Sequence, residues 1–295
     1  MIIHYRIHEV CEYINWIYFF HAWGFTARYA SIASIHGCDT CRAIWLTSFS
    51  ENERTIAAEA MQLFKEAKRM LNKLDKTSIT HGIFRLMEAN AEGNDLLIES
   101  IRLPLLRQQT AKVNPKEPYL CLSDFIRPLE NGIPDKIGIF ATTVDLSENS
   151  LHENDNYKLL LKQTLADRLA EATAEKLHEE VRKRIWGYVP NESLTIKQLH
   201  NEEFQGIRPA VGYPCLPDLS INFILDQLLD MKEIGITLTE NGMMHPHASV
   251  SGLMLAHPNS HYFNVGKIDE NQLKDYAKRR GISTENMRKF LATNL

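Results

Sequence analysis

The stretch YKLLLKQTLADRLAEATAEKLHEEVRKRIW, residues 157–186, holds the longest periodic pattern in this sequence. Its apolar residues recur at helical spacing, so that they share one face of a helix. They are Leu161, Leu165, Leu169, Leu177, Val181 and Ile185, with small residues interrupting the stripe near Thr173. Gly187 and Pro190 then end the pattern. The stretch therefore predicts one long helix that crosses the whole domain.

The segments before this helix mix helical and strand patterns. Residues 55–74 are amphipathic with helical spacing, whereas residues 95–101 and 137–144 are short β-like runs. Turn-forming residues precede the two runs at 90–93 and 131–132. Because helices and strands follow one another without a regular βαβ order, the pattern favours an α+β fold. We expect an antiparallel twisted sheet flanked by helices, in a single large domain.

The C-terminal third continues the mixture. Residues 221–235 predict a helix with Gly235 as its C-terminal signal. Residues 251–267 predict a hairpin of two strands with a proline-containing turn between them. Two short helices are expected to close the chain, separated near Gly281, with Ser283 as the N-cap of the last one.

Composition and charge exclude several classes of protein. The chain has 295 residues and a formal net charge of −4, which predicts neither a nucleic-acid partner nor an anionic membrane partner. Its most apolar stretch, residues 14–25, is about half as long as a membrane span and is expected to be a buried aromatic segment. Five cysteines argue against a disulfide framework, and no signal-peptide pattern is seen. We expect a cytoplasmic protein.

The segment GIRPAVGYPCLPD, residues 206–218, contains three prolines, which exclude a regular helix and a central strand. A rigid extended loop would hold Arg208 in place, and a guanidinium can grip a carboxylate with two hydrogen bonds. Gly212 would allow the backbone to approach a ligand, and Tyr213 offers an aromatic face and a hydroxyl. The alternative is a structural loop in which Arg208 pairs with a nearby glutamate.

GIRPAVGYPCLPD resembles the Arg-x-x-x-Gly-Tyr signature of the activation domain of cobalamin-dependent methionine synthase. Further segments resemble that family in its order and at its spacing: LRQQTAK at 106–112, and the segments at 119–128, 165–188, 238–253 and 257–268. The likeness runs from about Val10 to Leu295. Residues 1–50 are a divergent N-terminal part, with a loop at 30–50 that is unlike the family.

The resemblance implies the residues that bind S-adenosylmethionine. They are Asn15, Glu171, Glu202, Arg208, Gly212, Tyr213, Tyr262 and Phe263. Arg208 would anchor the methionine carboxylate, the aromatic residues would shape the pocket, and the two glutamates match acidic positions near the site. For Glu171 the alternative is a solvated helix face, since Asp167 and Glu175 lie one turn to either side.

Two segments depart from the family pattern. Asn15 stands where the family has an aspartate that touches the cofactor, so the chain keeps a hydrogen-bond acceptor and loses a negative charge. Beside a sulfonium this change is expected to cost about 1–2 kcal/mol of binding free energy, or roughly tenfold in affinity. Residues 217–222 are also less polar than in the family.

The function implied by the resemblance is reactivation of methionine synthase. When cob(I)alamin is oxidised to cob(II)alamin, the family brings S-adenosylmethionine to the corrinoid, and a flavodoxin-like donor supplies the electron. Because the cofactors provide nucleophile and leaving group, no catalytic residue is expected. We expect a split system in which the cobalamin-binding module of a separate methionine synthase chain is the partner. The alternatives are a non-catalytic module with a decayed pocket, and service to another corrinoid methyltransferase.

The motif HGCDTC places His36, Cys38 and Cys41 close together outside the family pattern. A lone CxxC lacks the second ligand pair of a structural zinc site, although His36 could supply a third ligand. A metal site, a redox pair and ordinary loop cysteines all remain open, and no metal is assigned from the sequence.

Overall fold

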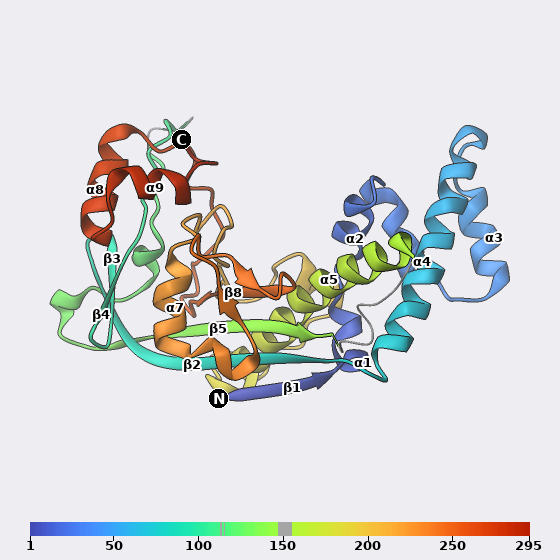
Figure 1. Cartoon of the computed structure of the whole chain (residues 1–295), viewed down its shortest axis with the longest axis horizontal. Coiled ribbons are helices and arrows are strands. Elements are labelled where there is room, and N and C mark those ends of the chain that lie inside the picture. The colour runs from blue at the N-terminus through green and yellow to red at the C-terminus, as the bar shows by residue number, and fades with distance from the viewer. Residues whose placement is uncertain (113, 115, 147–154) are drawn as a thin grey trace.

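A six-stranded antiparallel sheet forms the centre of the computed structural model, which describes residues 1–112, 114, 116–146 and 155–295. Its strands are β1 (Ile2–Arg6), β2 (Ile79–Glu92), β3 (Asp95–Ile98), β4 (Ile101–Pro104), β5 (Asp135–Asp145) and β8 (Ser249–Met254). The order is β4-β3-β2-β5-β8, and β1 pairs with the first residues of β2. β2 and β5 run along the molecule, and the sheet curls upward at its β3–β4 end (Figure 1). The predicted α+β fold, a twisted antiparallel sheet flanked by helices in one domain, is confirmed.

Helices cover both faces of the sheet. They are α1 (Ile7–Val10), α2 (Trp16–Ala22), α3 (Asp39–Thr47), α4 (Arg54–Leu74), α5 (Asn156–Glu180), α6 (Ile196–His200), α7 (Ile221–Leu229), α8 (Glu270–Arg280) and α9 (Thr284–Phe290). Alternate residues of β5 point to opposite sides, as a strand requires. Phe140 packs in the core under α5 and α4, whereas Ile137 and Ile139 pack in a second core under α7. A third cluster joins α8 and α9 to Leu106.

The long helix predicted from residues 157–186 is confirmed as α5. Leu161, Leu165 and Leu169 are buried along the stripe, and α5 contacts β2, β5 and β8. The helix continues into one π-helical turn, Val181–Ile185, before Gly187 turns the chain with φ +73°.

The helix predicted at residues 55–74 and the two short helices predicted to close the chain are also confirmed. α4 follows the amphipathic pattern, with its apolar stripe buried. Between α8 and α9, Gly281 adopts the left-handed conformation at φ +65°, as expected for a helix end. The Ser283 hydroxyl accepts a hydrogen bond of 3.3 Å from the Asn286 backbone N–H, so Ser283 is the N-cap.

Two predictions for the C-terminal third are wrong in part. The predicted hairpin fails because only β8 forms, and residues 261–267 run without strand structure along the loop at 213–215. The predicted helix at 221–235 breaks at Asp230, which has φ +56°, and a 3-10 turn, Met231–Ile234, follows. The Asp226 side chain accepts the Met231 N–H at 2.9 Å, which stabilises this break.

The turn expected at residues 90–93 begins later than predicted, because residues 90–92 extend β2. β1 and β2 themselves have no counterpart among the predicted strands. β2 pairs with three strands and has polar residues scattered along it, so it lacks the clean alternation that identifies a strand in sequence.

The expectations for the N-terminal part are met only in part. Residues 14–25 contain α2, whose Phe19 and Phe20 are fully buried, although Tyr18 is 56% exposed. The expected loop at 30–50 is instead largely helical, since it holds the end of a 3-10 helix, Ala27–Ser34, and all of α3. All five cysteines are free thiols. The described helices include none long and apolar enough to cross a membrane.

The proline-containing segment at 206–218 forms neither helix nor regular strand, as predicted, and lies against β8. Backbone hydrogen bonds of 2.9–3.0 Å join Ile207 to Leu255 and Pro209 to Leu253. Gly252 makes this close approach possible. A Cβ atom at position 252 would clash with the Pro209 carbonyl oxygen and would lie 2.9 Å from the Ala210 Cα. The backbone on both sides of Arg208 is therefore held on the sheet.

Replacing this glycine should loosen the segment. We expect Gly252→Ala to lower the free energy of unfolding by about 1–3 kcal/mol, because the clash is with backbone and can be relieved only by moving a chain segment. Chemical denaturation would measure the change. With both variants measured in the metal-free protein, Gly37→Ala is the control, since its Cβ would meet nothing closer than an Arg42 nitrogen at 3.8 Å. Equal stability of the two variants would contradict the packing described here.

Candidate functional site

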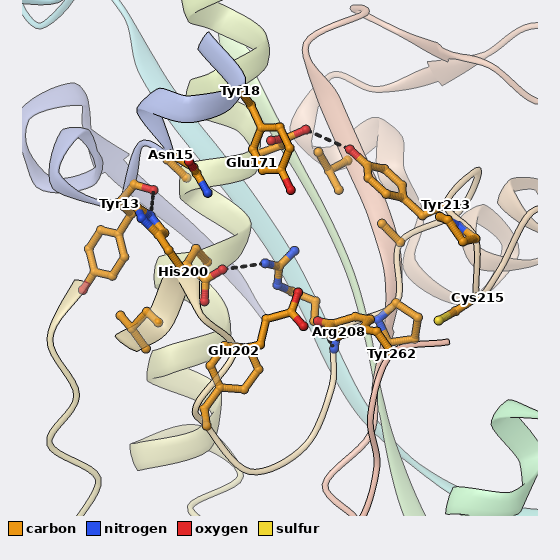
Figure 2. Close-up of a pocket in the computed structure, with 18 of the residues that line it drawn as sticks. Tyr13, Asn15, Tyr18, Glu171, His200, Glu202, Arg208, Tyr213, Cys215 and Tyr262 are labelled. Atoms are coloured by element: carbon orange, nitrogen blue, oxygen red, sulfur yellow. Dashed lines mark hydrogen bonds and ion pairs between the residues drawn. The ribbon is translucent and has the colours of Figure 1, made fainter. Parts of the chain in front are cut away.

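A cavity of about 660 Å³ lies between α5, the start of α2 and the 206–218 segment. Seven of the eight predicted binding residues line it (Figure 2). They are Asn15, Glu171, Glu202, Arg208, Tyr213, Tyr262 and Phe263. These residues come from four parts of the chain that the fold brings together. The volume is within the range of about 300–1,000 Å³ that is usual for small-molecule sites.

Arg208 lies in the wall of this cavity and is held from two sides. Its backbone N–H donates to the Tyr262 hydroxyl at 2.9 Å, and its Nη2 donates to Glu175 Oε2 at 2.8 Å. The two charged side chains are only 15% and 12% exposed. Burial is the largest single effect and acts to lower the pKa of Arg208, but Glu175, Tyr262 and Glu171 together outweigh it and raise that pKa above its usual value. Arg208 thus pairs with a glutamate, as the structural alternative anticipated, and it does so inside the cavity.

The ion pair leaves hydrogen-bonding capacity unused. Arg208 Nε and Glu175 Oε1 are both buried and have no hydrogen-bond partner. A buried polar atom without a partner costs about 1–3 kcal/mol, and more when it carries charge. The ion pair therefore holds one unpaired guanidinium donor and one unpaired carboxylate acceptor, which a ligand could reach after a shift of the two side chains. This arrangement suits a ligand that carries both an acidic and a basic group.

The cavity wall is acidic overall. Glu171 and Glu175 lie one turn apart on α5, and Glu202 faces them from a turn in which it adopts φ +59°. With Arg168 and Arg208, the ionisable acidic and basic groups of the lining carry a formal charge of −1, with His200 neutral. Burial, followed by repulsion from Glu175, raises the pKa of Glu202. A bound cation would relieve that repulsion.

Glu171 faces the cavity, so its alternative interpretation as a solvated helix face is wrong. Its carboxylate accepts hydrogen bonds of 2.8 Å from the Tyr213 hydroxyl and from Arg168 Nη1. Asp167, one turn earlier, points elsewhere and pairs with His247 at 3.1 Å. Of the three acidic residues spaced one turn apart on α5, Glu171 and Glu175 therefore line the cavity and Asp167 does not.

The predicted aromatic residues border the cavity at different depths. Tyr213 is half exposed, and burial of its other half together with Glu171 raises its pKa. Tyr262 is more enclosed, and desolvation raises its pKa to about 12. The backbone N–H of Phe263 donates to Cys215 Sγ at 3.0 Å, which ties the 261–267 segment to the loop. These contacts explain why the two segments lie together without pairing as strands.

Gly212 does not line the cavity. It adopts φ +88°, and its N–H donates to the Leu216 carbonyl at 2.8 Å, so it forms the turn that presents Tyr213. Its expected role in close approach to a ligand is replaced by a conformational one, since an L residue is strained at this φ.

Asn15 is engaged in capping α2. Its side-chain oxygen accepts the Ile17 N–H at 3.1 Å, which leaves the amide nitrogen pointing toward the cavity (Figure 2). The acceptor expected to face a ligand is therefore occupied.

The second segment that departs from the family, residues 217–222, has a structural role. The fully buried Asp218 accepts hydrogen bonds of 2.8 Å from Ser220 and Tyr276, and this anchors α8.

Residues 6–281 match the model of the family described as "Vitamin B12 dependent methionine synthase, activation domain". The chain belongs to this family. Among solved structures, the crystal structure of the MetH reactivation domain bound to AdoHcy is 38% identical, with a TM-score of 0.85. The match covers 100% of this chain and 90% of that chain. The resemblance stated from the motifs is confirmed, and the match from residue 6 includes most of the part expected to diverge.

Several residues lining the cavity of this activation domain were not predicted. They include Tyr13, Tyr18, Arg168, Glu175, His200 and Cys215. Glu175 carried a usable signal, because it stands four positions after Glu171 on a helix whose opposite face is apolar. Tyr18 likewise stands three positions after Asn15. Arg168 stands three positions before Glu171 and pairs with it at 2.8 Å on the same helix. Tertiary packing brings in His200, whose Nε2 lies 3.0 Å from the Tyr13 carbonyl oxygen.

The buried ion pair can be tested in the activation domain without any ligand. We expect Arg208→Ala to lower the free energy of unfolding by about 3 kcal/mol, since it leaves the Glu175 carboxylate buried and unpaired. Glu175→Gln in the same chain should restore part of that loss, because the uncompensated charge is removed. Chemical denaturation of the two single variants and the double variant completes the cycle.

The matched control is Arg288→Ala, which removes the same side chain from an ion pair with Glu270 that is about half exposed. It should cost less than about 1 kcal/mol. Additive effects of the substitutions at positions 175 and 208 would show that the two side chains do not interact.

Proposed function

We propose that this chain binds S-adenosylmethionine in the cavity and presents its methyl group to cobalamin, supporting the reductive methylation that reactivates methionine synthase. The carrying observation is the Arg208–Glu175 pair, in which a buried donor and a buried acceptor lie unused on one wall. Family membership and the AdoHcy found in the related MetH domain support the same ligand class. AdoHcy is the compound that remains when S-adenosylmethionine has given up its methyl group.

The charges of the cavity fit the proposed ligand. S-adenosylmethionine carries a carboxylate, an ammonium and a sulfonium, so its net charge is positive. Arg208 would hold the carboxylate and Glu175 the ammonium. Glu171 and Glu202 would supply the negative field that the sulfonium requires, and the lining's formal charge of −1 matches a ligand with one excess positive charge. Tyr213, at the rim, would cover the bound ligand.

The chain's own residues would bind, orient and shield the methyl donor. Cobalamin carried by the partner would supply the nucleophile: the sulfur–methyl bond of S-adenosylmethionine would break, the methyl group would pass to cobalt, and S-adenosylhomocysteine would be the leaving group. One electron from a flavodoxin-like donor balances the reaction that starts from cob(II)alamin. The side chains of the cavity therefore need no nucleophile or general base, and positioning is their contribution. The partner is the cobalamin-binding module of methionine synthase.

Ligand binding is the first test. Calorimetric titration with S-adenosylmethionine should give one site per chain, and Arg208→Lys should weaken it about 10- to 100-fold, because lysine keeps the charge and loses the fork that matches a carboxylate. Asn15→Asp should strengthen binding about tenfold, since the second carboxylate oxygen could face the sulfonium while the first caps α2.

Arg288→Ala serves as the control, because Arg288 does not line the cavity and forms a half-exposed ion pair with Glu270. This variant should bind as the unmodified chain does. No binding by the unmodified chain would contradict the proposal. Binding that appears only with Asn15→Asp would instead support the non-catalytic module with a decayed pocket.

Methyl transfer is the second test. The chain is mixed with a separately purified cobalamin-binding module in the cob(II)alamin state, a reduced flavodoxin-like donor and S-adenosylmethionine. We expect methylcobalamin to form, with a rate that falls about 10- to 100-fold for Arg208→Lys at subsaturating S-adenosylmethionine, in proportion to the lost affinity. The visible spectrum of the corrinoid reports the reaction.

Omission of the chain is the control, and an equal rate without it would overturn the proposal. If the ligand binds but a verified methionine synthase module is not methylated, another corrinoid protein becomes the expected partner.

A further inference from the structure

Three metal-ligating side chains meet outside the cavity, at the helical edge of the molecule where α3 lies beyond α4 (Figure 1). His36 precedes α3, Cys38 is its N-cap and Cys41 lies in its first turn. One imidazole nitrogen and the two sulfurs all lie within 4.8 Å of one another. No other group of three or more His, Cys, Asp or Glu residues in the described part of the chain brings its ligand atoms together in this way.

The ligand set and its spacing fit zinc. Zinc binds thiolate sulfur at about 2.3 Å and imidazole nitrogen at about 2.0–2.1 Å in a tetrahedral arrangement, which places neighbouring ligand atoms roughly 3.5–3.8 Å apart. The three atoms are thus at most about 1.3 Å farther apart than in a formed site. Side-chain rotation can close that gap, because His36 is exposed and both cysteines are only half-buried.

The backbone prepares the two sulfurs for a cation. Cys38 and Cys41 are three positions apart across the N-terminus of α3, and the Cys41 N–H donates to Cys38 Sγ at 3.4 Å. Such hydrogen bonds to a ligand sulfur orient it and favour its anionic form. Asp39 pairs with Arg42 at 3.1 Å, so these two charges offset each other. A divalent cation would then face two thiolates with little competing charge.

We propose that His36, Cys38 and Cys41 bind a zinc ion, with solvent in the fourth coordination position. The site would tie the end of the 3-10 helix Ala27–Ser34 to the first turn of α3. That 3-10 helix packs on α2 and α4, so the metal would fix the outer layer of helices rather than take part in chemistry at the cavity. This role is independent of S-adenosylmethionine binding.

Cobalt substitution tests the site in the full chain. The metal-free protein, kept reduced by a non-thiol reductant, is titrated with Co²⁺ while absorbance is recorded. We expect one equivalent to produce the thiolate-to-cobalt charge-transfer band and the visible bands of a tetrahedral site, and Zn²⁺ to displace it. Each loss of a ligand, by Cys38→Ser, Cys41→Ser or His36→Ala, should weaken Co²⁺ binding by more than about 10- to 100-fold. Removing a residue that only hydrogen-bonds to a metal ligand already weakens binding by that amount.

Cys11→Ser is the matched control, because Cys11 is also half-buried but stands apart from the cluster. It should leave the titration unchanged. Circular dichroism of each variant separates loss of ligand from loss of fold. Absence of the charge-transfer band in the unmodified chain would overturn the proposal, as would cobalt binding that survives both cysteine substitutions.

Discussion

The position of Arg208 depends on one backbone-to-backbone contact, the packing of residues 207–211 against β8. Hydrogen bonds on both sides of Arg208 fix the segment, and Gly252 provides the space that a side chain would fill. Proline at 209 removes a backbone donor and restricts φ, so the segment has few other conformations available. The guanidinium therefore meets α5 at a defined place, and the geometry of the cavity follows from that of the sheet.

The buried charges at this place are balanced but not satisfied. Glu175 keeps Arg208 ionised in a poorly solvated site, yet each keeps a buried atom without a partner. Such a pair contributes little to stability by itself, because the desolvation of two charges offsets much of their attraction. Its value lies in preorganisation of the guanidinium, while the two buried unpaired atoms become available to a zwitterionic ligand only when the side chains shift. The pKa of Glu202 is raised for a related reason: its carboxylate is partly buried and lies near the negative charge of Glu175.

The sequence predicted most of the helices and the class of the fold, because amphipathic periodicity is a local property. It missed β2, whose pairing with three strands depends on partners that are mostly distant in sequence. It also predicted a second hairpin strand at residues 261–267, which instead contacts the loop at 213–215, in part through the hydrogen bond from Phe263 N–H to Cys215 Sγ. Seven of eight site residues were placed in one cavity through family motifs rather than through chemistry visible in the sequence. Glu175 was overlooked although it stands one helical turn after Glu171, because its pairing with Arg208 is a tertiary contact that the sequence does not show.

Asn15 shows how two demands on one side chain can conflict. At the N-cap of α2 it must accept a backbone N–H, and its single oxygen does so. An aspartate in the same place would cap the helix with one oxygen and present the other, with its charge, to the cavity. Asparagine can meet only the first demand, because its oxygen caps the helix and its amide nitrogen, a hydrogen-bond donor, points into the cavity where a cationic ligand would lie. The helix is thus preserved while the electrostatic contribution to the ligand falls to Glu171 and Glu202. Both project from segments other than α2, so the substitution at position 15 leaves these two carboxylates in the cavity.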